Sequence, residues 1–445
     1  MLLIAASLVL VLFLAAQAAA AAQAPAVADL KRFPQDVSAY LPPDPDVPIA
    51  DYESQRIYAG EYLNRHYAPW HNLDLSYLDL SMDKVMEYHE ATAKKQHFSD
   101  GGKAFPAESM KKIMANGVID PEAEPRPGIA VADADVRVLP TSTPLYPSAA
   151  SARGDRGLLK MDALQNSALK PAEPLAIYAQ SKDGLWYFIA TGTVVGWVRS
   201  HKVAFVDDDF RERCELAEHR VVVRDNVRVR NEKKEVLATI KMGAVIPAEG
   251  EALLLPVRDK QTGLTAVAKF TPERGVALPF PVPFTPRNAV RAIGQAMGEP
   301  YGWGGMNGFR DCSALTRDYF SVFGVWLPRN SGDQARTGAG MPLRNVKVAD
   351  RAGTIAENGV PFATLIHMPG HIMLYAGMHE GVPVVIHNVW GVRKNMGNGQ
   401  VGRAVIGRTV ATSLRAGAEI ENRPKSSLFI DSISALIFPL TEVKR

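Results

Sequence analysis

Three residues in the last third of the chain have the types needed for thiol chemistry: Cys312, His371 and His387. Cys312 follows a glycine-rich segment and precedes apolar residues at helical spacing, so we expect it in the first turn of a helix capped by Asp311. The free N–H groups at a helix N-terminus favour the thiolate. The position therefore suits a nucleophile, although a first-turn cysteine is more often a small core residue.

The two histidines flank a predicted β-hairpin. Residues 370–388 contain two strand-like runs, HIMLYAG and VPVVIH, joined by turn residues around His379. A hairpin centred on His379 places His371 opposite His387, and directly paired side chains share a face with their Cβ atoms ~4.5–5.5 Å apart. One imidazole can then act as the base while the other orients it. A one-residue bulge would shift this register, so the pattern predicts adjacency and leaves the hydrogen bond open.

Metal binding is a second interpretation of the histidines, because His367, His371, His379 and His387 lie within 21 residues. Pro369 prevents a helical i,i+4 pair between His367 and His371, and no cluster of acidic ligands accompanies them. We therefore expect no metal and no cofactor.

The chain has only two cysteines, Cys214 and Cys312. In an exported protein an even number of cysteines ordinarily suggests a disulfide, and two buried thiols are the other simple interpretation. A first-turn thiol that faces a cleft would have to turn away from it to form a disulfide. We predict that Cys312 is reactive and that Cys214 is structural.

The segments around these residues resemble the NlpC-type cysteine peptidases of the papain-like class, which cleave peptidoglycan stem peptides. The matching segments are Pro300-Tyr301-x-Trp303-Gly304-Gly305, Asp311-Cys312-Ser313, Leu327-Pro328-Arg329-Asn330-Ser331, the strand from His371 to Tyr375-Ala376-Gly377, and His387 at the end of the next strand. The resemblance spans residues 285–440 and implies a papain-like α+β catalytic domain. It also implies that Cys312 attacks the substrate carbonyl, that His371 accepts its proton, and that His387 orients His371.

The same resemblance implies roles for three further residues. Tyr301 corresponds to a tyrosine near the thiol and the oxyanion, and Asp311 and Ser331 correspond to residues that receive the free α-amine and backbone of an N-terminal L-alanine. An acidic residue can select an ammonium group. The structural alternatives are a helix cap for Asp311 and a turn former for Ser331. Ala314 and Met373 depart from the smaller residues common in the family, so we expect the fine shape of the subsites to differ.

Other parts of the chain must position this site. Changes in composition and in hydrophobic periodicity separate them into several segments. Residues 25–127 are rich in Pro, Asp and Tyr with helical stretches, and they predict a mostly helical accessory region. Residues 128–205 and 206–277 contain short valine-rich and aromatic runs separated by turns, so strands dominate there. A proline-rich linker, 278–287, leads into the catalytic domain, 285–440.

The two β-rich segments share a short repeat, because Val136-Arg137-Val138 recurs 91 residues later as Val227-Arg228-Val229. The hairpin that ends in Gly196-Trp197-Val198 resembles the last hairpin of a bacterial SH3-like domain. We therefore expect a multidomain protein with a helical N-terminal region, two SH3-like β-barrels and the papain-like domain. Such accessory domains fit the family members that hydrolyse γ-D-glutamyl-L-diamino acid bonds.

Residues 1–24 form an apolar run that ends in small residues and predict a cleaved secretory signal, and a retained anchor is the alternative. We expect an exported protein of the periplasm or cell envelope, in contact with the membrane only through this segment. The net charge is +3 without a dense Lys/Arg cluster, which argues against nucleic-acid binding. Peptidoglycan peptides are the expected partner of a monomeric peptidase, and the alternative is a non-catalytic wall-binding protein.

Overall fold

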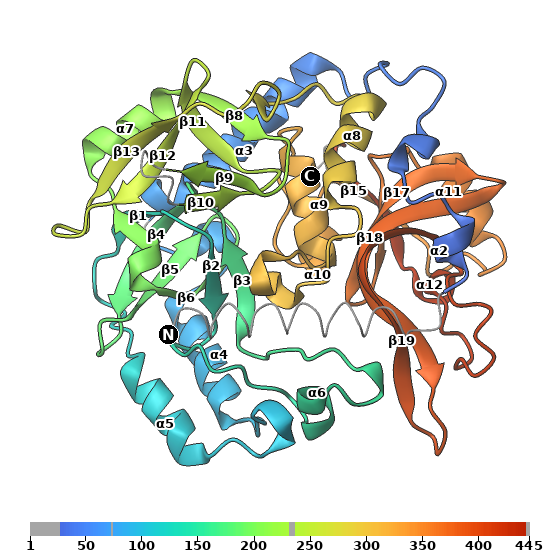
Figure 1. The fold of residues 1–445 in the computed structure, drawn as a ribbon, viewed down its shortest axis with the longest axis horizontal. Helices are drawn as coiled ribbons and strands as arrows, with labels where there is room; N and C mark the ends of the chain where they lie inside the picture. Colours follow the sequence, from blue (N-terminus) through green and yellow to red (C-terminus); the bar gives the residue numbers. More distant parts are fainter. Residues whose placement is uncertain (1–26, 73, 231–235, 442–445) are drawn as a thin grey trace.

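The computed structural model describes residues 27–72, 74–230 and 236–441. Two β-rich units lie on one side of the molecule and the C-terminal domain lies on the other, and helices from the N-terminal region reach both sides (Figure 1). The predicted signal, residues 1–24, falls outside the described residues. Within the described ranges, no helix combines the length and the apolar character needed to cross a membrane.

The N-terminal region is helical, as predicted. Its elements are α2 (Asp29–Arg32), η1 (Val37–Tyr40), α3 (Tyr52–His71), η2 (Ser76–Leu78), α4 (Met82–Lys94), η3 (Asp100–Gly102) and α5 (Ala107–Asn116). Asp51 caps α3 by accepting a hydrogen bond from the Ser54 N–H. On α3, Gln55 donates to the carbonyls of Val282 and Phe323, which ties this helix to the C-terminal domain. The N-terminal region therefore connects the C-terminal domain with the β-rich units against which its helices pack.

The first β-rich unit is a seven-stranded antiparallel sheet in the order β3-β2-β6-β5-β4-β1-β7. Its elements are β1 (Arg126–Ala130), β2 (Ala134–Arg137), α6 (Ala149–Arg153), η4 (Asp155–Gly157), β3 (Gln165–Leu169), β4 (Pro174–Gln180), β5 (Trp186–Thr191), β6 (Val195–Arg199), η5 (Ser200–Lys202) and β7 (Val203–Phe205). The predicted hairpin is β5 and β6, and Trp197 is fully buried beneath helices of the N-terminal region.

The second β-rich unit repeats the pairings of the first. Its elements are α7 (Asp208–Leu216), β8 (Glu218–Val222), β9 (Val227–Arg230), β10 (Val236–Ile240), β11 (Val245–Glu249), β12 (Ala252–Arg258), β13 (Thr265–Phe270) and β14 (Ala277–Pro279). The pairs β8–β11, β8–β14, β9–β10, β11–β12 and β12–β13 match β1–β4, β1–β7, β2–β3, β4–β5 and β5–β6 in chain order. The described strands close into a barrel in neither unit, so the two predicted SH3-like barrels are seen only as related open sheets.

The C-terminal domain is built on a six-stranded antiparallel sheet in the order β15-β20-β16-β17-β18-β19. Its helical elements are α8 (Pro286–Ile293), η6 (Gly294–Ala296), η7 (Trp303–Gly308), α9 (Cys312–Ser321), α10 (Ser331–Gln334), α11 (Arg351–Asn358) and α12 (Phe429–Ser432). Its strands are β15 (Ala339–Pro342), β16 (Leu365–Met368), β17 (His371–His379), β18 (Val382–Asn395), β19 (Val401–Ser413) and β20 (Ala435–Phe438). The combination of helices and one sheet agrees with the predicted α+β class.

Helix α9 packs on one face of this sheet. Its apolar residues Leu315 and Phe320 share a core with Ile372 and Leu374, whereas Met373 of the same strand belongs to the core on the other face. Alternate residues of a strand point to opposite faces, which explains this division. The packing holds the first turn of α9 against the beginning of β17, where the first predicted histidine lies.

Candidate active site

Cys312 is the first residue of α9, as predicted, and the Asp311 side chain caps the helix by accepting a hydrogen bond from the Ala314 N–H at 2.9 Å. The thiol is buried, and the backbone N–H groups of Ile372 and Ser313 are directed at its sulfur. Ile372 follows His371 in the chain, so the thiol lies against the backbone next to the predicted base.

The electrostatic prediction for this thiol is wrong. Burial and the nearby carboxylate of Asp311 together raise the pKa of Cys312 to about 12, because the two backbone N–H groups and the Arg329 cation offset them only in part. Burial also lowers the pKa of His371 to about 4. The cost of desolvating a charge exceeds the help from the helix N-terminus, so thiol and imidazole are both neutral near pH 7.

His371 and His387 are joined by a hydrogen bond, with 2.8 Å between His371 Nε2 and His387 Nδ1. The predicted adjacency is confirmed, but the predicted register is wrong. Leu374 pairs with Ile386, so His387 comes opposite Met373 and His371 is its diagonal neighbour on the same face. Diagonal imidazoles are long enough to meet across two strands.

A β-bulge brings the two imidazoles to one face. The turn itself consists of Glu380 and Gly381, both with positive φ, which is typical of a two-residue hairpin turn. At Ala376 the register between the strands is displaced by one residue. Without this displacement His387 would lie opposite Leu374, whose side chain points to the face opposite that of His371. The bulge thus decides whether the pair can form.

Two residues that the sequence did not mark complete the surroundings of the histidines. Thr412 Oγ1 lies 3.1 Å from His387 Nε2, and Thr412 is on β19, next to the strand that carries His387. Phe429 of α12 stacks on the His371 ring at 5.9 Å between centroids and meets the His387 ring edge-on at 5.2 Å. No sequence motif links these residues to the histidines. Thr412 is brought to them by the pairing of β19 with β18, and Phe429 by the packing of α12.

Two groups are candidate hydrogen-bond donors around the thiol, the Tyr301 hydroxyl and the Cys312 N–H. Among the described residues, no hydrogen bond joins the Cys312 thiol to His371, and Nδ1 of His371 is left without a partner; such bonds are often long before substrate binds. Burial, with Cys312 and Asp311 nearby, raises the pKa of Tyr301, so this hydroxyl keeps its proton. The Cys312 N–H at the start of the helix is a second donor, and no hydrogen bond engages it in the described part of the chain.

Asp311 is more fully occupied than predicted. Arg329 donates to both of its carboxylate oxygens, at 3.1 and 2.7 Å, and Gly304 N–H and Ser313 Oγ lie within 3.2 Å. With the cap to Ala314, five donors meet a carboxylate that has about four lone-pair sites. The predicted alternative role as a helix cap is therefore confirmed by the geometry.

Ser331 lies half-buried at the beginning of α10, and its hydroxyl has no hydrogen-bond partner among the described residues. Gln334 of the same short helix donates to the carbonyl of Ser313 at 2.9 Å and accepts from Thr316 Oγ1 at 2.7 Å. These bonds hold α10 beside the first turns of α9, so Ser331 is fixed at the start of α10 with a hydroxyl that no described residue occupies.

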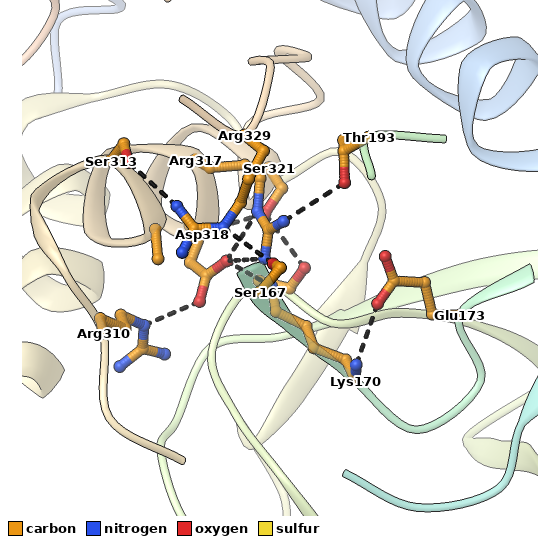
Figure 2. A network of polar contacts seen from close by, with 12 residues as sticks. Ser167, Lys170, Glu173, Thr193, Arg310, Ser313, Arg317, Asp318, Ser321 and Arg329 are labelled. Carbon is orange, nitrogen blue, oxygen red and sulfur yellow. Dashed lines mark hydrogen bonds and ion pairs between the residues drawn. The ribbon is translucent and has the colours of Figure 1, made fainter. Parts of the chain in front are cut away.

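A buried charge network joins α9 to both β-rich units. Figure 2 shows the part of it around Asp318, with Lys170 of the first unit and Arg310. Asp318 of α9 accepts from Lys170 of the first unit at 2.5 Å and from Arg310 at 2.7 Å. Arg310 also forks onto Asp225 of the second unit, with two distances of 2.7 Å. These cations hold the pKa of Asp318 far below its ordinary value despite burial. The network fixes helix α9 relative to the accessory units.

The remaining predicted candidates lie apart from this group. His367 bonds Ser434 Oγ at 2.7 Å, and His379 packs against the rings of Phe33 and Tyr40 at the far end of β17. Across the residues that the structure describes, no three His, Cys, Asp or Glu side chains gather as a metal site would require. Cys214 is a free thiol in the core of the second β-rich unit, separate from the core around Cys312.

Comparison with known families finds three matches along the chain. The NlpC/P60 family matches residues 298–401, which hold the thiol and both histidines. The SH3 domain (SH3b1 type) matches residues 150–199 in the first β-rich unit. The NLPC_P60 stabilising domain, N term, matches residues 5–121, which include the described N-terminal helices.

Curated relatives match the chain over short segments. The gamma-D-glutamyl-L-lysine dipeptidyl-peptidase of Bacillus subtilis (strain 168) is 34% identical over 130 residues, which are 28% of this chain and 42% of that protein. The peptidoglycan endopeptidase RipB of Mycobacterium tuberculosis is 33% identical over 106 residues, 20% of this chain and 38% of that protein. The chain thus spans less than half the length of either relative.

One solved structure shares almost the whole fold. The NlpC/P60 endopeptidase from Photobacterium damselae subsp. piscicida superposes with a TM-score of 0.82 over 93% of this chain and 98% of that chain, at 24% sequence identity. At this identity the likeness concerns the fold, including the arrangement of the accessory units around the C-terminal domain.

Proposed function

We propose that the chain is an NlpC/P60 protein with an N-terminal stabilising domain and an SH3 domain, and that it is a cysteine peptidase of peptidoglycan stem peptides. The observation that carries this proposal is the hydrogen-bonded pair of His371 and His387 beside a buried thiol at a helix N-terminus. A nucleophile, a base and an orienting group are the set that amide hydrolysis by a thiol needs.

The proposed reaction is hydrolysis of a γ-D-glutamyl-L-diamino acid bond. Cys312 Sγ attacks the γ-carbonyl carbon while its proton passes to His371 Nδ1, because both groups are neutral at rest. The Cys312 N–H and the Tyr301 hydroxyl are the proposed hydrogen-bond donors to the oxyanion that forms. His371 then returns the proton to the leaving amine, and water hydrolyses the thioester with His371 again as base.

The bond specificity is supported by the name of the Bacillus subtilis relative, whose substrate contains γ-D-glutamyl-L-lysine. We assign recognition of a free N-terminal L-alanine first to Ser331, whose hydroxyl is unoccupied among the described residues. Asp311 can take part only if an ammonium competes with Arg329 for its oxygens. The proposed substrate is therefore a short released peptide.

The cellular setting belongs to the same proposal. Both curated relatives have names that refer to peptidoglycan or to its peptide linkage, which supports action in the periplasm or cell envelope after export. The second β-rich unit is proposed to be a second SH3-like domain, because its strand pairings repeat those of the first. The protein is proposed to act as a monomer, without nucleic acid or cofactor.

The decisive experiment follows cleavage of L-Ala-γ-D-Glu-diaminopimelate and L-Ala-γ-D-Glu-L-Lys by the purified protein, with free and N-acetylated peptides. We expect release of the diamino acid by the wild type and no release by Cys312→Ala. Cys214→Ala is the matched control, since that thiol is also buried but lies in another core, and it should retain the rate. Cleavage by Cys312→Ala would refute the nucleophile, and a wild type that binds peptidoglycan without cleaving would support the non-catalytic alternative.

A further inference from the structure

The hydrogen bonds of the histidine pair continue beyond His387 and end on Thr412. His371, His387 and Thr412 lie on three neighbouring strands, β17, β18 and β19. The distances are 2.8 Å from His371 Nε2 to His387 Nδ1, 3.1 Å from His387 Nε2 to Thr412 Oγ1, and 3.0 Å from Thr412 Oγ1 to the Ser413 carbonyl oxygen. The three groups form one continuous chain across the sheet.

The carbonyl at the end of this chain sets the direction of its first bond. The Ser413 carbonyl can only accept, so the single hydroxyl proton of Thr412 points to it. Thr412 Oγ1 then has only lone pairs for His387, and His387 Nε2 must carry the proton of that bond. If the hydroxyl instead donated to His387 Nε2, no proton would lie between Thr412 Oγ1 and the Ser413 carbonyl oxygen, and that contact would not be a hydrogen bond. Only the first assignment makes both contacts hydrogen bonds.

The same direction passes on to the catalytic histidine. With Nε2 protonated, a neutral His387 has a lone pair on Nδ1 and accepts from His371 Nε2–H. A neutral His371 then has its lone pair on Nδ1, the nitrogen without a partner among the described residues. The opposite direction would place a proton on His371 Nδ1 and leave it unable to accept the thiol proton.

Burial protects this arrangement from water. Thr412 is 0% exposed and His387 is 1% exposed, so solvent cannot replace a missing hydroxyl. We propose that Thr412 is a positioning residue that sets the tautomer of His387 and, through it, makes His371 Nδ1 the base. The catalytic consequence rests on the proposed peptidase function, but the tautomer assignment does not.

The test measures ¹⁵N chemical shifts of the histidine side chains in labelled full-length protein near pH 7, with His387→Asn used to identify the His387 signals. The wild type should show His387 protonated at Nε2 and bare at Nδ1. Thr412→Val should move protonation towards Nδ1 and lower kcat roughly 100-fold, the size of a general-base contribution, with little change in KM. Thr412→Ser restores the hydroxyl and should recover the wild-type signals and most of the rate.

Thr409→Val is the matched control. Thr409 is on the same strand, is 1% exposed, and its hydroxyl has no partner in the described structure, so its removal should change neither the shifts nor the rate. A wild-type His387 protonated at Nδ1 would overturn the inference, whatever the stability of the variants. So would a Thr412→Val protein with unchanged shifts and kcat. A wild type with the expected tautomer but no cleavage would contradict the proposed function and leave the inference standing.

Discussion

Arg329 forks onto both carboxylate oxygens of Asp311, the residue immediately before the candidate nucleophile. The pair is buried, and the guanidinium holds the pKa of Asp311 below its ordinary value although burial alone would raise it. This relationship changes the expected role of the carboxylate, because its charge is already neutralised within the protein. Its main contribution is to support the first turn of α9.

Asp311→Asn tests this role. Asparagine can still cap the helix, but it leaves the Arg329 cation buried and unpaired, so the free energy of unfolding should fall by about 3 kcal/mol. The ratio of cleavage rates for free and N-acetylated tripeptides should stay close to that of the wild type. Ser331→Ala is the comparison, and it should lower this ratio with little loss of stability. A selective loss of free-amine preference in Asp311→Asn would restore the role implied by the family resemblance.

The interdomain charge network predicts a large cost for removing its central carboxylate. Asp318→Asn leaves Lys170 and Arg310 without their shared partner in a buried site, and the free energy of unfolding should drop by about 3–5 kcal/mol. Asp333→Asn breaks an exposed pair with Arg336 and should change stability by less than about 1 kcal/mol. Urea unfolding measures both, and similar losses in the two variants would argue against a role of the network in holding the units together.

Phe429 is expected to affect the rate through the orientation of the imidazoles. Phe429→Ala removes the ring that contacts both His371 and His387, and kcat should fall about 10-fold, because small displacements of catalytic groups are costly. Phe438→Ala is the control, since Phe438 is also partly buried against the same core but makes no ring contact with His371 or His387 among the described residues. Steady-state kinetics and thermal unfolding should show lost stability in both variants and lost kcat only in Phe429→Ala.

Buried histidines predict that the protein loses stability in mild acid. Burial lowers the pKa of His66 to about 3 and that of His89, His219 and His371 to about 4, against 6.5 for an exposed histidine. Between pH 6.5 and about 4 the unfolded chain binds protons that the folded protein does not, so stability falls as pH falls, by up to about 1.4 kcal/mol per pH unit for each histidine.

Thermal unfolding at pH 7.5, 6.5, 5.5 and 4.5 checks this sign. The Tm should be nearly constant between the first two values and should fall progressively below pH 6.5. A Tm that rises or stays level down to pH 4.5 would show that these histidines are protonated in the folded protein.

Local features of the site could be predicted from the sequence because neighbouring residues encode them. Asp311 and Cys312 mark a helix start through a capping side chain and the apolar spacing behind it. The strands that carry His371 and His387 are marked by β-type residues on both sides of a turn. The resemblance to the NlpC-type peptidases rests on the same segments, and the family match over residues 298–401 confirms it.

Contacts between distant segments required the tertiary structure. The bulge at Ala376 decides which residues of β17 and β18 point to the same face of the sheet. Unlike a turn, it is not marked by a characteristic residue type. Thr412 lies 25 residues after His387 in the chain and reaches it only because β19 pairs with β18. The raised pKa of Cys312 depends on burial by the whole domain, whereas the helix N-terminus by itself predicts a lowered one. The sequence by itself thus determined the helix start at Cys312 and the adjacency of His371 and His387, since capping and strand patterns are local. Only the tertiary structure decided their register, proton positions and charge states, since these depend on pairing across the sheet and on exclusion of water.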